Sequence, residues 1–191
     1  MDKPALVRWA NNLGLQGVDS AKYVDGMASI GTLTHYFIEC YLNKVKAELD
    51  DYTANQIEAA KRCFQKFLDW EKAKGMTREM YAISEGQLVS EKHRFGGTVD
   101  ICGVVNGKAT LIDIKTSKGI YGEQRTQVAG GYRLLCEEAG YGIENITILR
   151  VGRDDAEGFE EITVPMAESD LHVKRFLICR ALYDINQKIG K

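Results

Sequence analysis

Several classes of protein are excluded by what this chain lacks. No apolar run approaches the ~20 residues that a membrane-spanning helix needs, so we expect no membrane partner. The opening MDKPALVRWA contains an acid and a proline, and no apolar segment follows, which is not typical of a secretory signal peptide. The motifs GxSxG and HExxH are absent, which disfavours an unrelated metal-binding α/β hydrolase.

An excess of positive charge is also missing. The net charge is −2, whereas a basic balance would have favoured nucleic acid as a partner. This absence excludes nothing, because a locally basic groove or a bound metal ion can still meet phosphate.

No CxxC pair occurs, so the spacings of zinc ribbons and iron–sulfur sites are absent. The number of cysteines is 5, which is odd, and they lie far apart in the sequence. We therefore expect reduced thiols that serve as small core residues in a cytoplasmic protein. They are Cys40, Cys63, Cys102, Cys136 and Cys179.

The composition is that of a globular protein, with 45% apolar and 27% charged residues in 191. Residues 1–75 read as helices. One of them has the Thr53–Gln56 capping pattern, and Gly26 and Gly31 are able to break another in two. The apolar stripe of that second helix is Ile30, Leu33, Phe37, Tyr41 and Val45.

From residue 76 the sequence changes to β-branched runs, in the order β-β-β-α-β-β-α, and ends in an amphipathic helix. The sequence therefore predicts a mixed α/β fold, with helices packed on a small sheet. We expect one domain over 1–191, made of a helical part, 1–75, and an α/β core, 76–191.

The most informative stretch is GGTVDICGVVNGKATLIDIKTSK, residues 96–118. Asn106-Gly107 between two β runs predicts a hairpin with a type I′ turn, in which Val105 pairs with Lys108. This register places Asp100 directly opposite Asp113, with Cβ atoms about 4.5–5.5 Å apart. Two opposed carboxylates in a core-like setting are destabilising unless a cation compensates them, and hard oxygen ligands suit Mg²⁺ or Mn²⁺.

Lys115 lies two residues after Asp113 and points to the same face of the strand, whereas Ile114 points into the core. A carboxylate pair can hold a metal ion that binds phosphate and activates water. An adjacent ammonium can steady the attacking water or the charge that develops on phosphorus. The alternative is an ordinary Asp113–Lys115 ion pair on a solvated face, with Asp100 in a turn.

Taken together, GGTVD and LIDIKTSK resemble the GxxD and (D/E)xK core of the PD-(D/E)XK nuclease superfamily, and more narrowly the RecB-type and phage-type exonucleases. The resemblance covers roughly residues 4–140. It implies a restriction-endonuclease-like fold and metal-dependent hydrolysis of DNA.

Two segments upstream of the hairpin extend this resemblance. IGTLTHYFIE is similar to the family's GxxxH helix, which implies that His35 is a metal ligand, with Glu39 one turn further in a structural role. ISEGQLVSEKHRFGGTVD is similar to the strand that carries a glutamate facing the cleft, a role that falls to Glu85 rather than Glu91. His93 and Arg94 are candidates for DNA-backbone contacts.

A third segment, EQRTQVAGGYRLL, resembles the family's Q-x₃-Y helix, but Gln127 and Tyr132 are five residues apart instead of four. In an α-helix they would point ~140° apart. Either Gly130-Gly131 deforms the helix, or one of the pair is not the family residue; Gln124 lies closer to the face of Tyr132.

The resemblance implies that Asp100 and Asp113 hold Mg²⁺ or Mn²⁺ together with His35 and the carbonyl of Ile114, while Lys115 positions the nucleophile. Thr116, Ser117 and Lys118 follow on a loop where DNA-backbone contacts are frequent in the family; a polar turn is the alternative. Members with an iron–sulfur cluster use several clustered C-terminal cysteines, and only Cys179 lies there, so no cluster is implied.

We therefore expect an exonuclease in phage or prophage recombination or in DNA repair. DNA would be its substrate, a single-strand annealing protein a candidate partner, and a homo-oligomer a candidate assembly. Two alternatives remain. One is a structure-specific endonuclease of the same superfamily. The other is a non-catalytic DNA-binding module, which the presence of Asp100, Asp113 and Lys115 disfavours.

Overall fold

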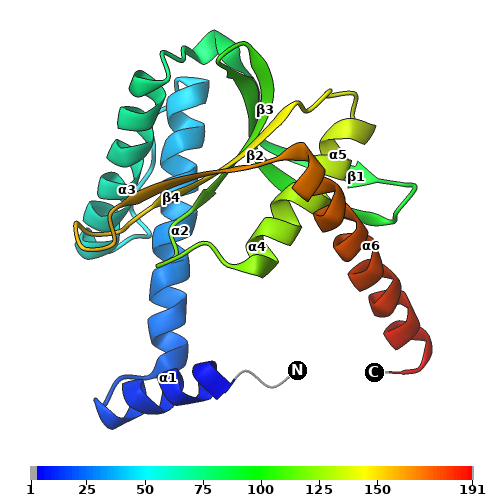
Figure 1. Cartoon of the computed structure of the whole chain (residues 1–191). Coiled ribbons are helices and arrows are strands. Elements are labelled where there is room, and N and C mark those ends of the chain that lie inside the picture. The colour runs from blue at the N-terminus through cyan, green and yellow to red at the C-terminus, as the bar shows by residue number, and fades with distance from the viewer. Residues whose placement is uncertain (1–3, 191) are drawn as a thin grey trace.

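A mixed five-stranded sheet with helices on both faces forms the centre of the protein (Figure 1). The structure is a computed structural model and describes residues 4–190. Residues 1–3 and residue 191 lie outside the described part, although the predicted domain includes them. The stretch that is unlike a signal peptide begins with residues 1–3. Among residues 4–190, no helix is both long and apolar enough to cross a membrane.

The strands follow one another in the sheet in the order of the chain. They are β1 (Tyr81–Ser90), β2 (Phe95–Val105), β3 (Lys108–Lys115), β4 (Asn145–Val151) and β5 (Phe159–Val164). Only β3 and β4 run parallel, because the helical segment between them carries the chain back to the same edge. The other neighbours are antiparallel. The predicted order β-β-β-α-β-β-α and the mixed α/β class are confirmed.

The first three helices are α1 (Pro4–Leu15), α2 (Ser20–Asn43) and α3 (Ala54–Ala73). Helices α2 and α3 pack side by side on one face of the sheet, and α1 turns away at the far end of α2 (Figure 1). The capping box of Thr53 and Gln56 is confirmed at the start of α3. The core on this face includes Phe67 of α3 and Ile112 and Ile114 of β3.

Two expectations for α2 are corrected. Neither Gly26 nor Gly31 breaks the helix, because the helical hydrogen bonds continue through both. Val45 is not part of the apolar stripe, because Lys44 ends the helix in the left-handed conformation (φ 59°), and Val45 beyond it is exposed.

The opposite face of the sheet is covered by α4 (Gly122–Thr126), a π-helical segment (Gln127–Tyr132) and α5 (Arg133–Glu138). They pack on Val99, Cys102 and Leu111 of the sheet. The terminal helix α6 (Met166–Lys188) crosses this layer, and Phe176 lies against Gly130 and Gly131.

Two further expectations are only partly met. Helix α6 forms as predicted, but Ser169 is its one buried residue, so its apolar side chains do not build a core. Of the five cysteines, four are buried as expected and Cys179 on α6 is exposed. The buried Sγ atoms of Cys102 and Cys136 lie 3.4 Å apart as thiols.

The hairpin between β2 and β3 has the predicted turn and register. Asn106 and Gly107 have φ values of 51° and 77°, as a type I′ turn requires. Val105 pairs with Lys108, and the same register continues to Ile101 and Ile112. The ladder ends there, one pair short of Asp100 and Asp113, so the predicted direct opposition of these two aspartates is not part of the strand pairing.

Candidate active site

Asp113 and Lys115 lie at the last residues of β3, on one face of the strand. The Lys115 Nζ is 2.9 Å from Oδ1 and 2.8 Å from Oδ2 of Asp113. The ion pair is not solvated, because the Asp113 side chain is fully buried. Its Oδ2 is buried and accepts no hydrogen bond of suitable geometry. A buried carboxylate is destabilising unless a cation compensates it, and the Lys115 ammonium is the cation that lies beside it here.

The Asp100 side chain bonds to β3 just beyond the point where the backbone pairing of β2 and β3 ends. Its Oδ2 accepts a hydrogen bond from the backbone N–H of Ile114, at 2.7 Å. Burial raises the pKa of Asp100. Burial, followed by the charge of Asp100, raises the pKa of Asp113 to about 7. The two carboxyl groups therefore resist joint ionisation, as the hairpin register suggested, although a different contact brings them together.

His35 projects from α2 toward this end of the sheet. Its Nδ1 lies 2.9 Å from Glu85 Oε1 and 3.6 Å from Asp100 Oδ2. Its Nε2 lies 3.1 Å from the carbonyl oxygen of Ile114. Burial lowers the pKa of His35, but Asp100 and Glu85 outweigh burial and raise it to about 9. Both ring nitrogens face acceptors, so the ring is an imidazolium here, a cation held among carboxylates.

Glu85 reaches His35 because β1 is irregular at this point. Its φ is 50°, in the left-handed region that costs a non-glycine residue about 1–2 kcal/mol. Gly86 is required next to it, because a Cβ there would lie 2.4 Å from Cγ2 of Ile83. Strained backbone of this kind concentrates at functional sites. The glycine in an otherwise regular strand was the sequence signal for this kink.

The mismatch in the Gln127–Tyr132 spacing is resolved by the π-helical segment. A π-helix closes its hydrogen bonds between residues five apart, so residues at that spacing share a face. Gln127 Nε2 accordingly donates to the Tyr132 hydroxyl at 2.8 Å. Gly130 and Gly131 allow this segment, because a Cβ on either would lie under 3 Å from α6.

Tyr132 faces the site, and Gln124 does not replace Gln127. Burial, followed by the charges of Asp113 and Asp100, raises the pKa of Tyr132. Its ring lies over Gly97, where a Cβ would come within 3.1 Å of Cε1. Gln124 is occupied elsewhere, accepting from the Tyr121 N–H and donating to Ser117 Oγ. Gln127 is therefore the glutamine that accompanies Tyr132.

Thr116, Ser117 and Lys118 form the loop after β3, as expected. Ser117 donates to the carbonyl of Gly119, which shapes the loop. Gly31 of α2 lies directly against this loop, since a Cβ there would be 3.0 Å from Thr116 Oγ1. A glycine one turn before His35 therefore lets α2 approach the end of β3.

The remaining sequence candidates lie away from this group. Glu91, His93 and Arg94 form the turn between β1 and β2. Arg94 pairs with Asp184 on α6 at 2.6 Å, and His93 Nε2 is 3.8 Å from Glu138 Oε1. The structure thus gives Arg94 and His93 contacts within the fold.

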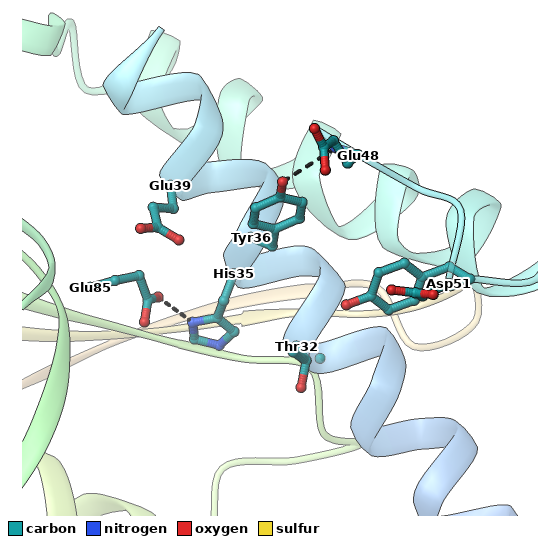
Figure 2. Close-up of a pocket in the computed structure, with 9 residues that line it drawn as sticks. Thr32, His35, Tyr36, Glu39, Glu48, Asp51 and Glu85 are labelled. Carbon is teal, nitrogen blue, oxygen red and sulfur yellow. Dashed lines mark hydrogen bonds and ion pairs between the residues drawn. The ribbon is translucent and has the colours of Figure 1, made fainter. Parts of the chain in front are cut away.

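A cavity of about 660 Å³ opens beside His35, and we refer to it as the acid cavity. Its lining includes the carboxylates of Glu39, Glu48, Asp51 and Glu85, and no Lys or Arg of the described residues lines it. Figure 2 shows Glu39 one turn after His35, on the side where Glu85 meets the imidazole. Sequence reasoning missed Glu48 and Asp51, which come from the α2–α3 connection and carry no motif.

Three side chains at this end of the sheet lie close enough together to hold a metal ion. Ligand atoms of His35, Glu85 and Asp100 all lie within 4.8 Å of one another. Asp113 is not among them; Lys115 engages it. Carboxylates, one imidazole and a backbone carbonyl suit Mg²⁺ or Mn²⁺. The carboxylates of Glu85 and Asp100 around the His35 ring agree with a site that has capacity for a divalent cation.

Comparison with known proteins adds no assignment. The chain matches no family in a scan of protein-family models, and no curated protein matches its sequence.

Proposed function

We propose that the protein is a metal-dependent deoxyribonuclease that degrades DNA from an end, with a restriction-endonuclease-like core. One observation carries the proposal. His35, Glu85 and Asp100 come from three separate elements and converge beside the buried Asp113–Lys115 pair. The resemblance of GGTVD and LIDIKTSK to PD-(D/E)XK nucleases supports it independently. A role in phage recombination or DNA repair, alongside an annealing protein, belongs to the same proposal.

Each residue of the group has a proposed task. His35, Asp100, Asp113 and the carbonyl of Ile114 would hold Mg²⁺ or Mn²⁺, and Glu85 lies close enough to join them. A divalent cation bound there supplies Lewis-acid stabilisation of phosphate and a more acidic water. For His35 to become a ligand, the ring nitrogen that binds the ion must lose its proton; the surrounding carboxylates hold that proton in the metal-free protein.

Lys115 acts beside the Asp113 carboxylate. Its ammonium is held by that carboxylate and is partly exposed, so one of its three donors can point to a substrate oxygen. It orients the attacking water and offsets the negative charge on the phosphoryl group. Tyr132, kept in place by Gln127, shields the face of the site next to Gly97 and limits water there.

The experiment is a nuclease assay on end-labelled linear and on closed circular duplex DNA, with Mg²⁺, Mn²⁺ or EDTA. We expect metal-dependent loss of linear DNA only. Asp113→Asn and Lys115→Ala should each lower the rate by at least about a hundredfold. Lys108→Ala, at the other end of β3, is the matched control and should cleave at the wild-type rate.

Two results would contradict the proposal. Cleavage of closed circles would indicate an endonuclease. Calcium- or manganese-dependent binding of DNA with no cleavage by the wild type would indicate a non-catalytic module.

A further inference from the structure

A second hollow, the aromatic groove, begins where the active site ends. Its volume is about 570 Å³, within the range of ligand pockets. Thr116, Ser117 and Lys118 line it and directly follow Lys115. The opposite walls come from α1 and from the first half of α2. The groove meets the active site next to Gly31, because the missing side chain of this residue lets α2 lie against Thr116.

Three aromatic rings line this groove, although it lies on the surface. Trp9 and Tyr121 are 36% and 54% exposed, and Trp9 meets Tyr23 edge to face at 5.9 Å. Helix α1 contributes no buried residue, so Trp9 is not there to fill a core. Exposed rings with free faces are the usual platform on which bases of single strands stack.

Positive charge lies beside the rings. Lys118 lines the groove, and its charge helps to lower the pKa of Glu157, but no hydrogen bond or ion pair joins its ammonium to another described residue. Arg153 also lines the groove, with its guanidinium bonded to Glu157. Lys118 is therefore the cation of the groove that no carboxylate binds directly, and only Thr116 and Ser117 separate it from Lys115 in the chain. A backbone phosphate placed along the loop meets these groups before it reaches the active site.

The occupant that fits both features is a single nucleic-acid strand. Unstacked bases present faces that rings can cover, whereas the bases of a duplex are already stacked on one another. Apolar residues in the same lining, such as Leu6 and Val24, suit base faces better than they suit phosphate. The acid cavity on the other part of α2 repels phosphate, which leaves the groove as the approach.

We propose that the aromatic groove binds the single-stranded end of a DNA substrate, by stacking bases on Trp9 and Tyr121 and pairing Lys118 with the backbone, and feeds that strand to Lys115 and Asp113. The proposal rests on the proposed nuclease function, since it specifies the substrate class of that site.

Trp9 supplies a direct readout. The chain has 2 tryptophans, and the other, Trp70, is 4% exposed and gives a constant background. With EDTA present to prevent cleavage, a 12-nucleotide oligothymidylate should quench the exposed tryptophan. An oligothymidylate–oligoadenylate duplex of the same length should bind at least about tenfold more weakly.

Four variants test the groove, with affinity measured by anisotropy of a labelled oligothymidylate. Trp9→Ala and Tyr121→Ala should each weaken binding by about fivefold to a hundredfold, and Trp9→Phe should keep binding while removing the quench. Lys118→Ala should reduce the slope of log affinity against log salt by about one. Val7→Ala is the control on α1, because Val7 is exposed outside the groove. Circular dichroism checks that each variant is folded.

The outcomes separate the two proposals. Equal binding of duplex and single strand, or full affinity in both Trp9→Ala and Tyr121→Ala, overturns the groove while leaving the nuclease proposal to its own assay. A third outcome is that oligothymidylate quenches Trp9 fluorescence and the groove variants lose affinity for it, while the wild type cleaves no DNA. This outcome supports single-strand binding by the groove but overturns its role in feeding a nuclease.

Discussion

Two consecutive stretches of α2 line hollows of opposite character. Residues 31–39 line the acid cavity, which has four carboxylates, the His35 imidazole and no Lys or Arg of the described residues. Residues 23–28 line the aromatic groove, which has Lys118, Arg153 and exposed rings. His35 and the loop after Lys115 lie where the two meet. One helix therefore separates a region suited to a cation from a region suited to a phosphate-bearing strand.

The difference follows from which segments pack beside each half of the helix. The connection between α2 and α3 brings Glu48 and Asp51 next to the second half, and Tyr36 fixes it by accepting a hydrogen bond from the Glu48 N–H (Figure 2). The loop after β3 and helix α1, which turns away at the far end of α2 (Figure 1), line the hollow beside the first half. The net charge of the whole chain, −2, gives no sign that acidic and basic side chains line separate hollows.

The largest effect is expected at His35, and Glu39, one turn further along α2 in the acid cavity, serves for comparison. His35→Gln should lower metal-dependent cleavage by at least about a hundredfold, because it removes a ring that contacts Glu85, Asp100 and Ile114. Glu39→Gln should lower it by less than about tenfold, because Glu39 lines the cavity without touching those groups. Steady-state rates across Mg²⁺ concentrations measure both. Equal losses would mean that the whole cavity, rather than its end at His35, binds the cation.

An intermediate effect is expected at the junction between the two hollows. Gly31→Ala places a methyl group 3.0 Å from Thr116 Oγ1, so the Thr116 side chain, the loop or α2 must give way slightly. We expect about a tenfold loss of activity from the displaced site.

Gly26→Ala is the matched control for that substitution. It lies on the same helix with nothing within 4 Å of the added Cβ, so it should raise the free energy of unfolding by about 0.5–1 kcal/mol without loss of activity. Urea unfolding and initial rates of both variants measure this. A fully active Gly31→Ala protein would show that the close approach of α2 to Thr116 is unimportant.

The smallest effect concerns the ion pair in the groove wall. Arg153 holds the pKa of Glu157 below its usual range by hydrogen bonding. The native state therefore binds fewer protons than the unfolded chain in mildly acidic solution. The stability from this pair is present above the unfolded pKa of about 4.5 and is lost as the pH falls through the lower folded pKa.

Glu157→Gln tests that linkage and the charge of the groove together. It should cost about 1 kcal/mol of stability at pH 7 and flatten the pH dependence of unfolding below pH 5. The same change frees the Arg153 guanidinium, so oligothymidylate should bind a few times more tightly. Urea unfolding between pH 3 and 7 and anisotropy titrations measure the two effects. Weaker binding in this variant would show that Arg153 needs its partner to be positioned.

Local sequence signals determined much of the framework. Asn106-Gly107 determined a type I′ turn, which few other dipeptides form. The pairing of β2 with β3 then followed by counting residues outward from this turn. The capping box at Thr53 was readable for the same reason, because it depends on neighbours along the chain. The strand β3 was also predicted from its β-branched run, although its central residues are all buried and do not alternate. The hairpin itself selected Asp100, Asp113 and Lys115, and the resemblance added His35 and Glu85; the fold brings these five residues to one place. Their catalytic roles stay predictions.

Other features were settled by tertiary packing. The sequence alone determined a hairpin that carries two acids and a lysine toward one end of a small α/β sheet. Only the fold decided that Asp100 would bond the Ile114 N–H instead of pairing opposite Asp113, and that Glu85 would adopt a left-handed backbone beside His35. It also decided that Gly130-Gly131, pressed against α6, would widen one turn and bring Gln127 to Tyr132. Each of these depends on a contact between segments far apart in the chain, and residue spacing along the sequence carries no information about such contacts.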